Sequence, residues 1–338
     1  MNGVARGDRD RRGPAALVPA LEVGGTHVSA AVIGLDVGRF LPGTRRRLPL
    51  RAGDAVEAVM DTISRCASAT AAAKDATWGV AIPGPFDCAH GIGRFRGVGK
   101  FECLDGVDVG RLLLESIRPT PWRLHFLNDA DAFLLGGWSS GAAAGHDRAV
   151  AVTLGTGVGS AFLDRWAIID AGPDVPPEGR ADLLRIAGRP LEETVSRRAI
   201  MTRYAMLTDR TLAPGEDVRD IAERALDGEA AARAVFGGAF ESLGRALSLW
   251  LARFRATILV VGGAVANSWD LVSEPLAIGI RAADHTLLDR VAVARGQLGD
   301  DAPLIGAARH AAASRQRSQD RGIRSRPASG SSTGVPDA

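Results

Sequence analysis

Three glycine-bearing turns are the residues of this sequence that point most directly to chemistry. Each follows a run rich in Val, Ile and Leu, and they read Gly24-Gly25-Thr26, Gly155-Thr156-Gly157 and Gly262-Gly263. Because glycine has no Cβ, backbone N–H groups at such turns can approach phosphate oxygens closely. One such turn often only closes a hairpin, whereas three indicate a phosphate-bearing ligand held from several sides. The sequence therefore predicts an enzyme that uses a nucleotide.

The pair Asn128-Asp129 follows an apolar run over residues 123–127, which reads as a strand. A kinase that phosphorylates an alcohol needs a carboxylate within hydrogen-bond reach of the hydroxyl, to take its proton. Asp129 is the candidate for this general base, and Asn128 is the candidate for binding a neighbouring hydroxyl. The alternative is that the pair only caps a helix that begins at Ala130. Asp131 is a competing carboxylate that should point away from Asp129.

Glu22 stands just before the first glycine turn. Its carboxylate is a candidate ligand of Mg²⁺, directly or through water, because this ion prefers oxygen ligands. The alternative is a solvated carboxylate at a strand end. Thr26 and Thr156 offer hydroxyls beside the turn amides, or are ordinary turn threonines. Gly262-Gly263 either contacts the adenosine of a nucleotide or only packs a strand against the next helix.

Apolar spacing predicts an alternation of strands and helices. Strands are expected over residues 17–23, 28–34, 78–82, 123–127, 149–154, 160–163 and 257–261, and helices after Asp54 and over 191–204, 218–226 and 230–253. The order places two similar halves in tandem, each opening with strand, glycine turn and strand. We expect an α/β fold with mixed sheets and the ligand in a cleft between two lobes.

Composition narrows the function classes. The chain has 338 residues, 46% of them hydrophobic and 24% charged, which is ordinary for a globular protein with well-buried cores. A net charge of +2 is too small to indicate nucleic-acid binding. No apolar run reaches the roughly 20 residues of a membrane helix, and the polar N-terminus lacks the apolar core of a secretory signal. We expect a cytoplasmic enzyme with no membrane or nucleic-acid partner.

Five motifs occur in the order found in the ROK family, which the chain resembles over nearly its whole length, from about residue 17 to 312. They are Leu21-Glu22-Val23-Gly24-Gly25-Thr26, Gly79-Val80-Ala81-Ile82-Pro83-Gly84-Pro85, Leu127-Asn128-Asp129-Ala130, Thr153-Leu154-Gly155-Thr156-Gly157-Val158-Gly159 and Leu259-Val260-Val261-Gly262-Gly263. That family comprises bacterial sugar kinases, glucokinase among them, and related sugar-sensing repressors, within the actin/hexokinase-like superfamily.

The resemblance implies a two-lobed actin/hexokinase-like, ribonuclease H-like fold and phosphoryl transfer from ATP with Mg²⁺. It assigns the phosphates to the first two glycine turns and the adenosine to Gly262-Gly263. It assigns the sugar to Asn128 and Asp129, with Pro83 and Gly84 bordering the pocket. Since dimers are common among relatives, a homodimer is expected.

The same likeness suggests how the chain divides. A small α/β lobe is expected over residues 16–130, completed by a C-terminal helix over about 303–313, and a large α/β lobe over 131–302. Residues 1–15 would form a disordered basic arm. The Ser-, Arg- and Gly-rich residues 314–338 would form a disordered tail.

Three departures from the family pattern bear on the site. The first motif has Glu22 where the family usually has Asp. The region of the family's zinc motif contains neither Cys nor His, so no structural zinc is expected, and Glu178 and Glu192 are the residues left to align with two sugar-contacting glutamates. Gly99-Lys100-Phe101 replaces the usual loop near the sugar, where Lys100 is either a ligand contact or an exposed loop lysine.

The leading hypothesis is an ATP-dependent kinase of a primary hydroxyl of a hexose such as glucose. The missing histidine of the zinc motif opens an alternative acceptor, a valiolone-like C7-cyclitol of natural-product biosynthesis. A third hypothesis is a non-catalytic sugar-sensing regulator, but only about 20 polar residues precede Glu22, too few for a helix-turn-helix domain. The sequence leaves polyphosphate open as an alternative donor.

Overall fold

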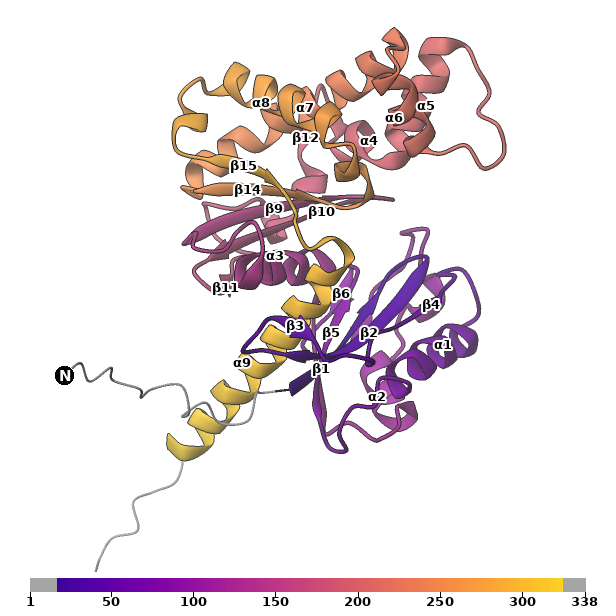
Figure 1. Ribbon diagram of the computed structural model, residues 1–338, viewed down its shortest axis with the longest axis vertical. Helices are drawn as coiled ribbons and strands as arrows, with labels where there is room; N and C mark the ends of the chain where they lie inside the picture. The colour runs from indigo at the N-terminus through magenta and orange to yellow at the C-terminus, as the bar shows by residue number, and fades with distance from the viewer. Residues whose placement is uncertain (1–16, 325–338) are drawn as a thin grey trace, which may run out of the picture.

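The computed structural model describes the backbone of residues 17–324 and the side chains of residues 17–317 (Figure 1). The expected basic arm over residues 1–15 and the end of the expected tail, 325–338, lie outside the described residues. Two mixed sheets, each with helices on its faces, lie one above the other in Figure 1. The predicted α/β fold with mixed sheets is confirmed.

The first sheet has the strand order β3-β2-β1-β5-β8, with β4 also paired to β2. Strands β1, β5 and β8 are parallel, whereas β2 is antiparallel to β1 and pairs antiparallel with β3 and β4. The carboxyl ends of the three parallel strands therefore meet at one edge. The bounds are β1 Leu17–Val23, β2 His27–Gly34, β3 Arg39–Phe40, β4 Arg46–Pro49, β5 Thr77–Ile82 and β8 Arg123–Asn128.

Helices α1 (Val56–Ser68) and α2 (Val109–Ser116) cover one face of this sheet, and α9 (Ala302–Arg324) covers the other. In β1 the alternation is visible: Leu21 packs with α1, whereas Ala20 packs with α9. A small hairpin of β6 (Phe86–Asp87) and β7 (Ile92–Gly93) follows β5. With helices on both faces, the central strands β2 and β5 are buried along almost their whole length.

The second sheet has the order β11-β10-β9-β14-β15. Here β9, β14 and β15 are parallel, and β10 returns antiparallel to β9 around the second glycine turn. The bounds are β9 Arg148–Leu154, β10 Val158–Asp164, β11 Ala167–Ile168, β14 Ile258–Gly262 and β15 Ala292–Arg295. Helices α7 (Ala230–Arg253) and α8 (Trp269–Ala283) pack on one face, and α3 (Asp129–Ser140) packs on the other.

Helices α3 and α9 cross in close contact and join the two sheets (Figure 1). A Cβ added at Gly306 would overlap the carbonyl of Ala132, and one at Gly136 would overlap the carbonyl of Ala302. A helix was expected over about 303–313, with disorder from residue 314, but α9 continues to Arg324. The expected end was wrong because Arg and Gln have good helix propensity and neither Gly nor Pro occurs between 314 and 321.

The connection between β10 and α7 carries short elements and two helices. A helix was expected over 191–204, but the chain breaks at Ser196, whose Oγ accepts a hydrogen bond from the Ala199 amide (3.3 Å). The bounds are β12 Arg185–Ile186, β13 Arg189–Pro190, α4 Glu192–Val195, α5 Arg197–Thr208 and α6 Val218–Leu226.

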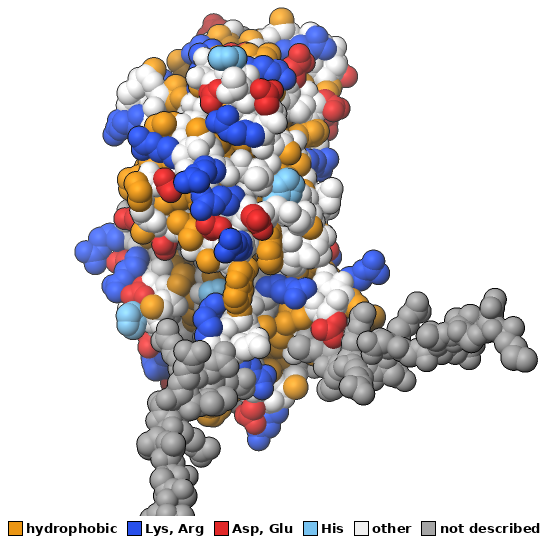
Figure 2. Space-filling model, turned by 90° about the vertical axis from the view of Figure 1, so that its left-hand side faces the viewer, with side chains coloured by type: hydrophobic (Ala, Val, Ile, Leu, Met, Phe, Trp, Pro, Cys, Tyr) orange, Lys and Arg blue, Asp and Glu red, His pale blue; other side chains and the backbone are white. Residues whose placement is uncertain are grey.

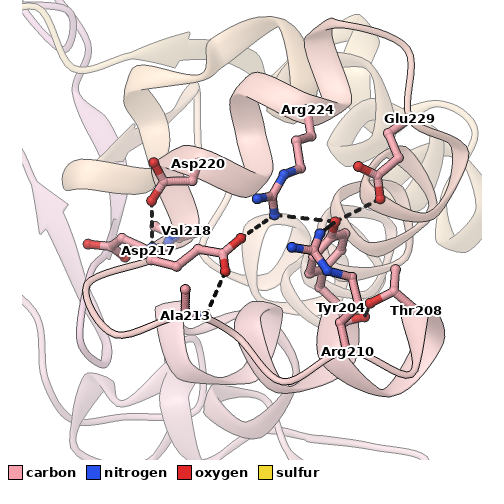
Figure 3. Close-up of polar contacts among 10 residues, drawn as sticks. Tyr204, Thr208, Arg210, Ala213, Asp217, Val218, Asp220, Arg224 and Glu229 are labelled. Carbon is pink, nitrogen blue, oxygen red and sulfur yellow. Dashed lines mark hydrogen bonds and ion pairs between the residues drawn. The ribbon is translucent and has the colours of Figure 1, made fainter.

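A polar cluster around Tyr204, the chain's one tyrosine, ties α5 to α6 (Figure 3). The Tyr204 hydroxyl donates to Glu229 Oε1 (2.8 Å) and accepts from Arg224 (3.3 Å) and Arg210 (3.2 Å). Arg224 also pairs with Glu216, whose second oxygen accepts from the Ala213 amide (2.9 Å). These bonds fix the loop between the two helices.

On the face drawn in Figure 2, basic and acidic side chains are interspersed with apolar ones rather than gathered in a single patch. Within residues 17–324, none of the helices is both long and apolar enough to span a membrane.

Candidate active site

Asn128 and Asp129 lie where β8 passes directly into α3. The Oδ1 atoms of both side chains accept from the Ala130 amide, each at 2.9 Å, so both cap the helix. Among the described residues, Asn128 Nδ2 and Asp129 Oδ2 make no hydrogen bond. Capping and ligand binding are therefore compatible: one atom of each side chain fixes its orientation, and the other is available to a ligand.

Asp129 is half-buried, and its surroundings control its charge. Burial raises the pKa of the Asp129 carboxyl, and the negative charge of Glu22 raises it further. The positive charge of Lys100 and the Ala130 amide lower this pKa, but not enough to offset burial. A carboxylate with a raised pKa binds a proton more strongly than an exposed aspartate, which is what a general base requires.

Pro83 and Gly84 follow β5, the strand next to β8, and Ile82 stands opposite Asn128 in the register. A Cβ added at Gly84 would lie 3.3 Å from Asn128 Nδ2. The bond between Gly84 and Pro85 is cis. The structure therefore brings Gly84 beside Asn128, and the assignment of Pro83 and Gly84 to the border of a sugar pocket stays a prediction.

Glu22 lies near the end of β1, opposite Ala81 of β5. Its Oε2 is 3.7 Å from His27 Nε2, and both atoms are buried without a hydrogen-bond partner. An orphaned buried carboxylate oxygen is costly unless a cation or a water satisfies it, so Glu22 fits the part of a magnesium ligand. His27, which the sequence analysis did not select, belongs to this group, and its place directly after the first turn was the available signal.

The first turn is compact. The Gly24 amide donates to the His27 carbonyl (2.8 Å), and Thr26 Oγ1 lies 3.2 Å from His27 Nδ1. No atom lies within 4 Å of a Cβ added at Gly25, so the space beside that backbone is open. Thr26 is exposed.

The second and third turns lie at one edge of the second sheet, because β9 and β14 are parallel neighbours. Gly263 has a φ of 84°, and a Cβ there would overlap the backbone of Leu154. Only glycine permits this approach, which sets the third turn against the start of the second. Within the second turn the Gly155 amide donates to the Gly157 carbonyl (3.0 Å), and Thr156 is exposed. Gly262 packs against the ring of Phe133 on α3.

Contacts through α3 link this second turn to Asp129. A Cβ added at Gly159, in the strand that leaves the turn, would lie 3.1 Å from the Cβ of Ala130. The residue after Asp129 therefore contacts β10. Glu22, Pro83-Gly84, Asn128-Asp129 and the second and third turns are thus connected by neighbouring contacts, although they come from distant parts of the sequence.

The two glutamates aligned with sugar contacts differ in position. Glu192 Oε2 accepts from the Val158 amide (3.1 Å), and the carboxylate lies against Gly157. Glu178 has a side chain that is 79% exposed and a single ion pair, to Arg180 Nη1 at 3.8 Å. The structure therefore places Glu192 at the second glycine turn and leaves Glu178 outside the group around Asp129.

Asp131 was expected to point away from Asp129, yet the two carboxylates influence each other. Burial, then the charges of Asp129 and Asp170, raise the pKa of Asp131 to about 7. Asp170 could not be foreseen from the sequence, because its approach to Asp131 depends on the path of the loop after β11. In the described part of the chain, no three His, Cys, Asp or Glu side chains are grouped as a metal site.

Comparison with known proteins agrees with this architecture. Residues 18–169 match the model of the ROK family. The glucokinase of Thermotoga maritima is 25% identical over 313 residues, which cover 85% of this chain and 95% of the relative.

Two solved structures share the fold. A ROK family glucokinase from Streptomyces griseus, in complex with glucose and AMPPNP, has a TM-score of 0.71 at 22% identity and covers 87% of this chain and 98% of its own. A ROK hexokinase from Thermus thermophilus has a TM-score of 0.70 at 22% identity, with coverage of 89% and 99%. The match to the ROK family model therefore covers residues 18–169, and the chain as a whole shares the fold of these two ROK family structures.

Proposed function

We propose that the protein is an ATP-dependent sugar kinase that transfers the γ-phosphoryl group to a primary hydroxyl of a hexose, glucose being the first candidate. The observation that carries this proposal is the position of Asp129. Its carboxyl has a raised pKa, it follows Asn128, whose Nδ2 lies next to Gly84, and the next residue, Ala130, contacts the strand after the second glycine turn. The similarity to a glucokinase supports the choice of acceptor.

In this mechanism Asp129 Oδ2 takes the proton of the acceptor hydroxyl as the oxygen attacks phosphorus, and Asn128 Nδ2 donates to a neighbouring hydroxyl. The amides of Gly24-Gly25-Thr26 and Gly155-Thr156-Gly157 stabilise charge on the phosphates. Gly262-Gly263 borders the adenosine. Magnesium, held by Glu22 directly or through water, would neutralise phosphate charge when bound.

Glu192 stabilises the second glycine turn, in addition to any contact with the acceptor. Its carboxylate accepts from the Val158 amide on one side of the turn, and the Arg197 amide donates to the Gly155 carbonyl (3.0 Å) on the other. We therefore assign Glu192 to holding the phosphate-binding turn as well as to the sugar side. Glu178 is exposed, so it would reach the acceptor only if the 3-10 helix Pro177–Gly179 that carries it moves.

A second acceptor class is a valiolone-like C7-cyclitol. What favours it is the segment over residues 175–193, which contains neither Cys nor His and so offers no zinc motif to position a sugar-binding histidine. The chemistry at Asp129 would be the same. We further propose a cytoplasmic homodimer without structural zinc.

The test is ADP release in a coupled assay with glucose, mannose, N-acetylglucosamine, fructose and a C7-cyclitol. We expect turnover with a hexose in the presence of Mg²⁺, and loss of turnover after chelation. Asp129→Asn should lower kcat by about 100- to 10,000-fold while glucose still binds in calorimetry, because the amide cannot take the proton. Turnover with the cyclitol alone would replace the hexose assignment, and turnover in Asp129→Asn near that of the parent would remove Asp129 as the base.

A further inference from the structure

Lys100 stands out in a chain that relies on arginine for its positive charge. It is one of only two lysines, with Lys74, among 41 basic residues. It lies in the loop between β7 and the 3-10 helix Glu102–Leu104. The sequence left open whether it contacts a ligand or is an exposed loop lysine, and the structure decides how the loop holds it.

The loop is fixed on both sides of Lys100. On one side Gly99, with a φ of 72°, donates its amide to Glu102 Oε1 (3.0 Å). On the other, Phe101 is fully buried, its ring 5.6 Å from that of Phe95. Because both neighbours are held, the backbone of Lys100 is fixed in place, and so is the point from which its side chain leaves the loop.

The same loop is joined to the first glycine turn by two backbone hydrogen bonds. The Phe101 amide donates to the Ala52 carbonyl (3.0 Å), and the Ala52 amide donates to the Gly25 carbonyl (3.3 Å). Lys100 is therefore positioned relative to the turn that is assigned to the phosphates.

Lys100 is half-buried as a residue, and its ammonium makes no ion pair or hydrogen bond among the described residues. Unlike Lys100, the two arginines that precede it each have an acidic partner: Arg94 pairs with Asp87 (3.3 Å) and Arg96 with Asp105 (3.1 Å). An ammonium without a protein partner can donate to an oxygen of a bound ligand, which would supply the missing hydrogen bond.

Three charged groups act on or beside Asp129. Glu22 is negative, Asp131 has a pKa raised to about 7 and is therefore partly protonated near neutral pH, and Lys100 is the positive group whose charge reaches the Asp129 carboxylate. We propose that Lys100 is a further residue of the acceptor site, whose ammonium faces the carboxylate of Asp129 and donates a hydrogen bond to an oxygen of the bound acceptor. The acceptor contact rests on the proposed kinase function; the approach to Asp129 does not.

The first experiment needs no substrate. The carboxyl carbons of aspartate are labelled with ¹³C, the Asp129 signal is identified by its loss in Asp129→Asn, and its titration is followed by NMR. In Lys100→Met the Asp129 signal should titrate at higher pH than in the parent, because a positive charge has been removed. Lys100→Arg, which keeps the charge, and Lys74→Met, which removes the other, exposed lysine, should titrate as the parent does. An unchanged titration in Lys100→Met would overturn the proposal.

The second experiment measures the acceptor contact with glucose, or with the best acceptor of the panel. Lys100→Met should raise the KM for the acceptor by about 10- to 100-fold, the usual effect of losing a hydrogen bond from a charged donor, and leave the KM for ATP within about twofold. Lys100→Gln can donate a hydrogen bond but carries no charge, so its KM for the acceptor should lie between those of the parent and of Lys100→Met. A shifted titration with an unchanged acceptor KM would disprove the acceptor contact, whereas a parent enzyme that phosphorylates nothing would disprove the kinase assignment and leave the NMR result standing.

Discussion

Asn128 and Asp129 each carry out two tasks with different atoms. Oδ1 of each accepts from the Ala130 amide, which satisfies one of the N–H groups that a helix start leaves unpaired. That bond restricts each side chain and leaves Nδ2 of Asn128 and Oδ2 of Asp129 available to the proposed acceptor. A general base gains from such restriction, because the reacting geometry is then set before the substrate arrives.

Asp131 gives a prediction at this scale. Its pKa of about 7, raised mainly by burial, means that the folded protein holds a proton there which the unfolded chain has already lost above pH 4. Stability therefore falls as pH rises from about 4 to 7. Asp131→Asn removes this loss of stability. The melting temperature of the variant should therefore exceed that of the parent at pH 8, and the difference between the two should be much smaller at pH 5.

Thermal melts of both proteins at the two pH values provide the measurement. The buried His310, whose pKa is lowered to about 4 by burial, titrates over part of the same range in the opposite sense, but it is present in both proteins and cancels in the difference. Asp131→Asn should also keep the activity that Asp129→Asn loses. An equal gain at pH 5 and pH 8 would contradict the assigned pKa.

At the scale of elements, the crossing of α3 and α9 is the contact most sensitive to volume. The carbonyl of Ala132 occupies the space that a side chain at Gly306 would need. Gly306→Ala should force the helices apart and lower the free energy of unfolding by about 1–3 kcal/mol. Gly238→Ala is the matched control: it lies exposed within α7 with no atom near the added Cβ, and should stabilise the protein by about 0.5–1 kcal/mol.

Denaturant unfolding of both variants would test this pair of effects. Equal stability changes in the two variants would show that the crossing tolerates an extra methyl group. Because α3 begins at Asp129, a displaced crossing should also lower kcat in Gly306→Ala and leave Gly238→Ala unaffected.

The elements were predictable from the sequence to the extent that their signals are local. Apolar runs that end in glycine turns predicted β1, β2, β9, β10 and β14, because strand and turn preferences act over a few residues. The break at Ser196 was missed, since a serine within an apolar-periodic segment caps a helix only when the chain before it turns. The length of α9 was missed for a similar reason: a polar, Arg-rich composition indicates disorder unless one face of the helix is already packed.

At the scale of the whole molecule, the site depends on contacts that no local pattern contains. Gly263 against the backbone of Leu154, and Glu192 against Gly157, join segments that only the complete second sheet brings together. The carboxyl ends of β1, β5 and β8 gather Glu22, Gly84 and Asn128 in the same way, and that grouping was foreseeable once the strands were taken as parallel. The exposed position of Glu178 could not be foreseen, because aligning a residue with a family motif does not show how the loop that carries it runs in space.

The last prediction concerns how the first sheet is attached to the connection that leads from the second sheet into α9. Arg47 of β4 pairs with Asp300 (2.6 Å), and Arg45 pairs with Asp301 (2.7 Å), both acids lying in the 3-10 helix Gly299–Asp301. The hydrogen bond from Arg47 lowers the pKa of Asp300, whereas burial and the charges of Asp300 and Glu22 raise the pKa of Asp301 despite Arg45. The two pairs should therefore contribute unequally.

Double-mutant cycles to alanine, read as free energies of unfolding at pH 7, should give Arg47 and Asp300 a coupling of about 0.2–1 kcal/mol, the usual range for exposed pairs, and Arg45 and Asp301 a smaller one. Because these side chains are partly exposed, both couplings should nearly vanish in 1 M NaCl, where the screening length is about 3 Å. The larger coupling should also decline as pH falls through the lowered pKa of Asp300, since protonation removes the charge that Arg47 stabilises. A larger coupling for Arg45 and Asp301, or one insensitive to salt, would mean that packing rather than charge attaches β4 to this connection.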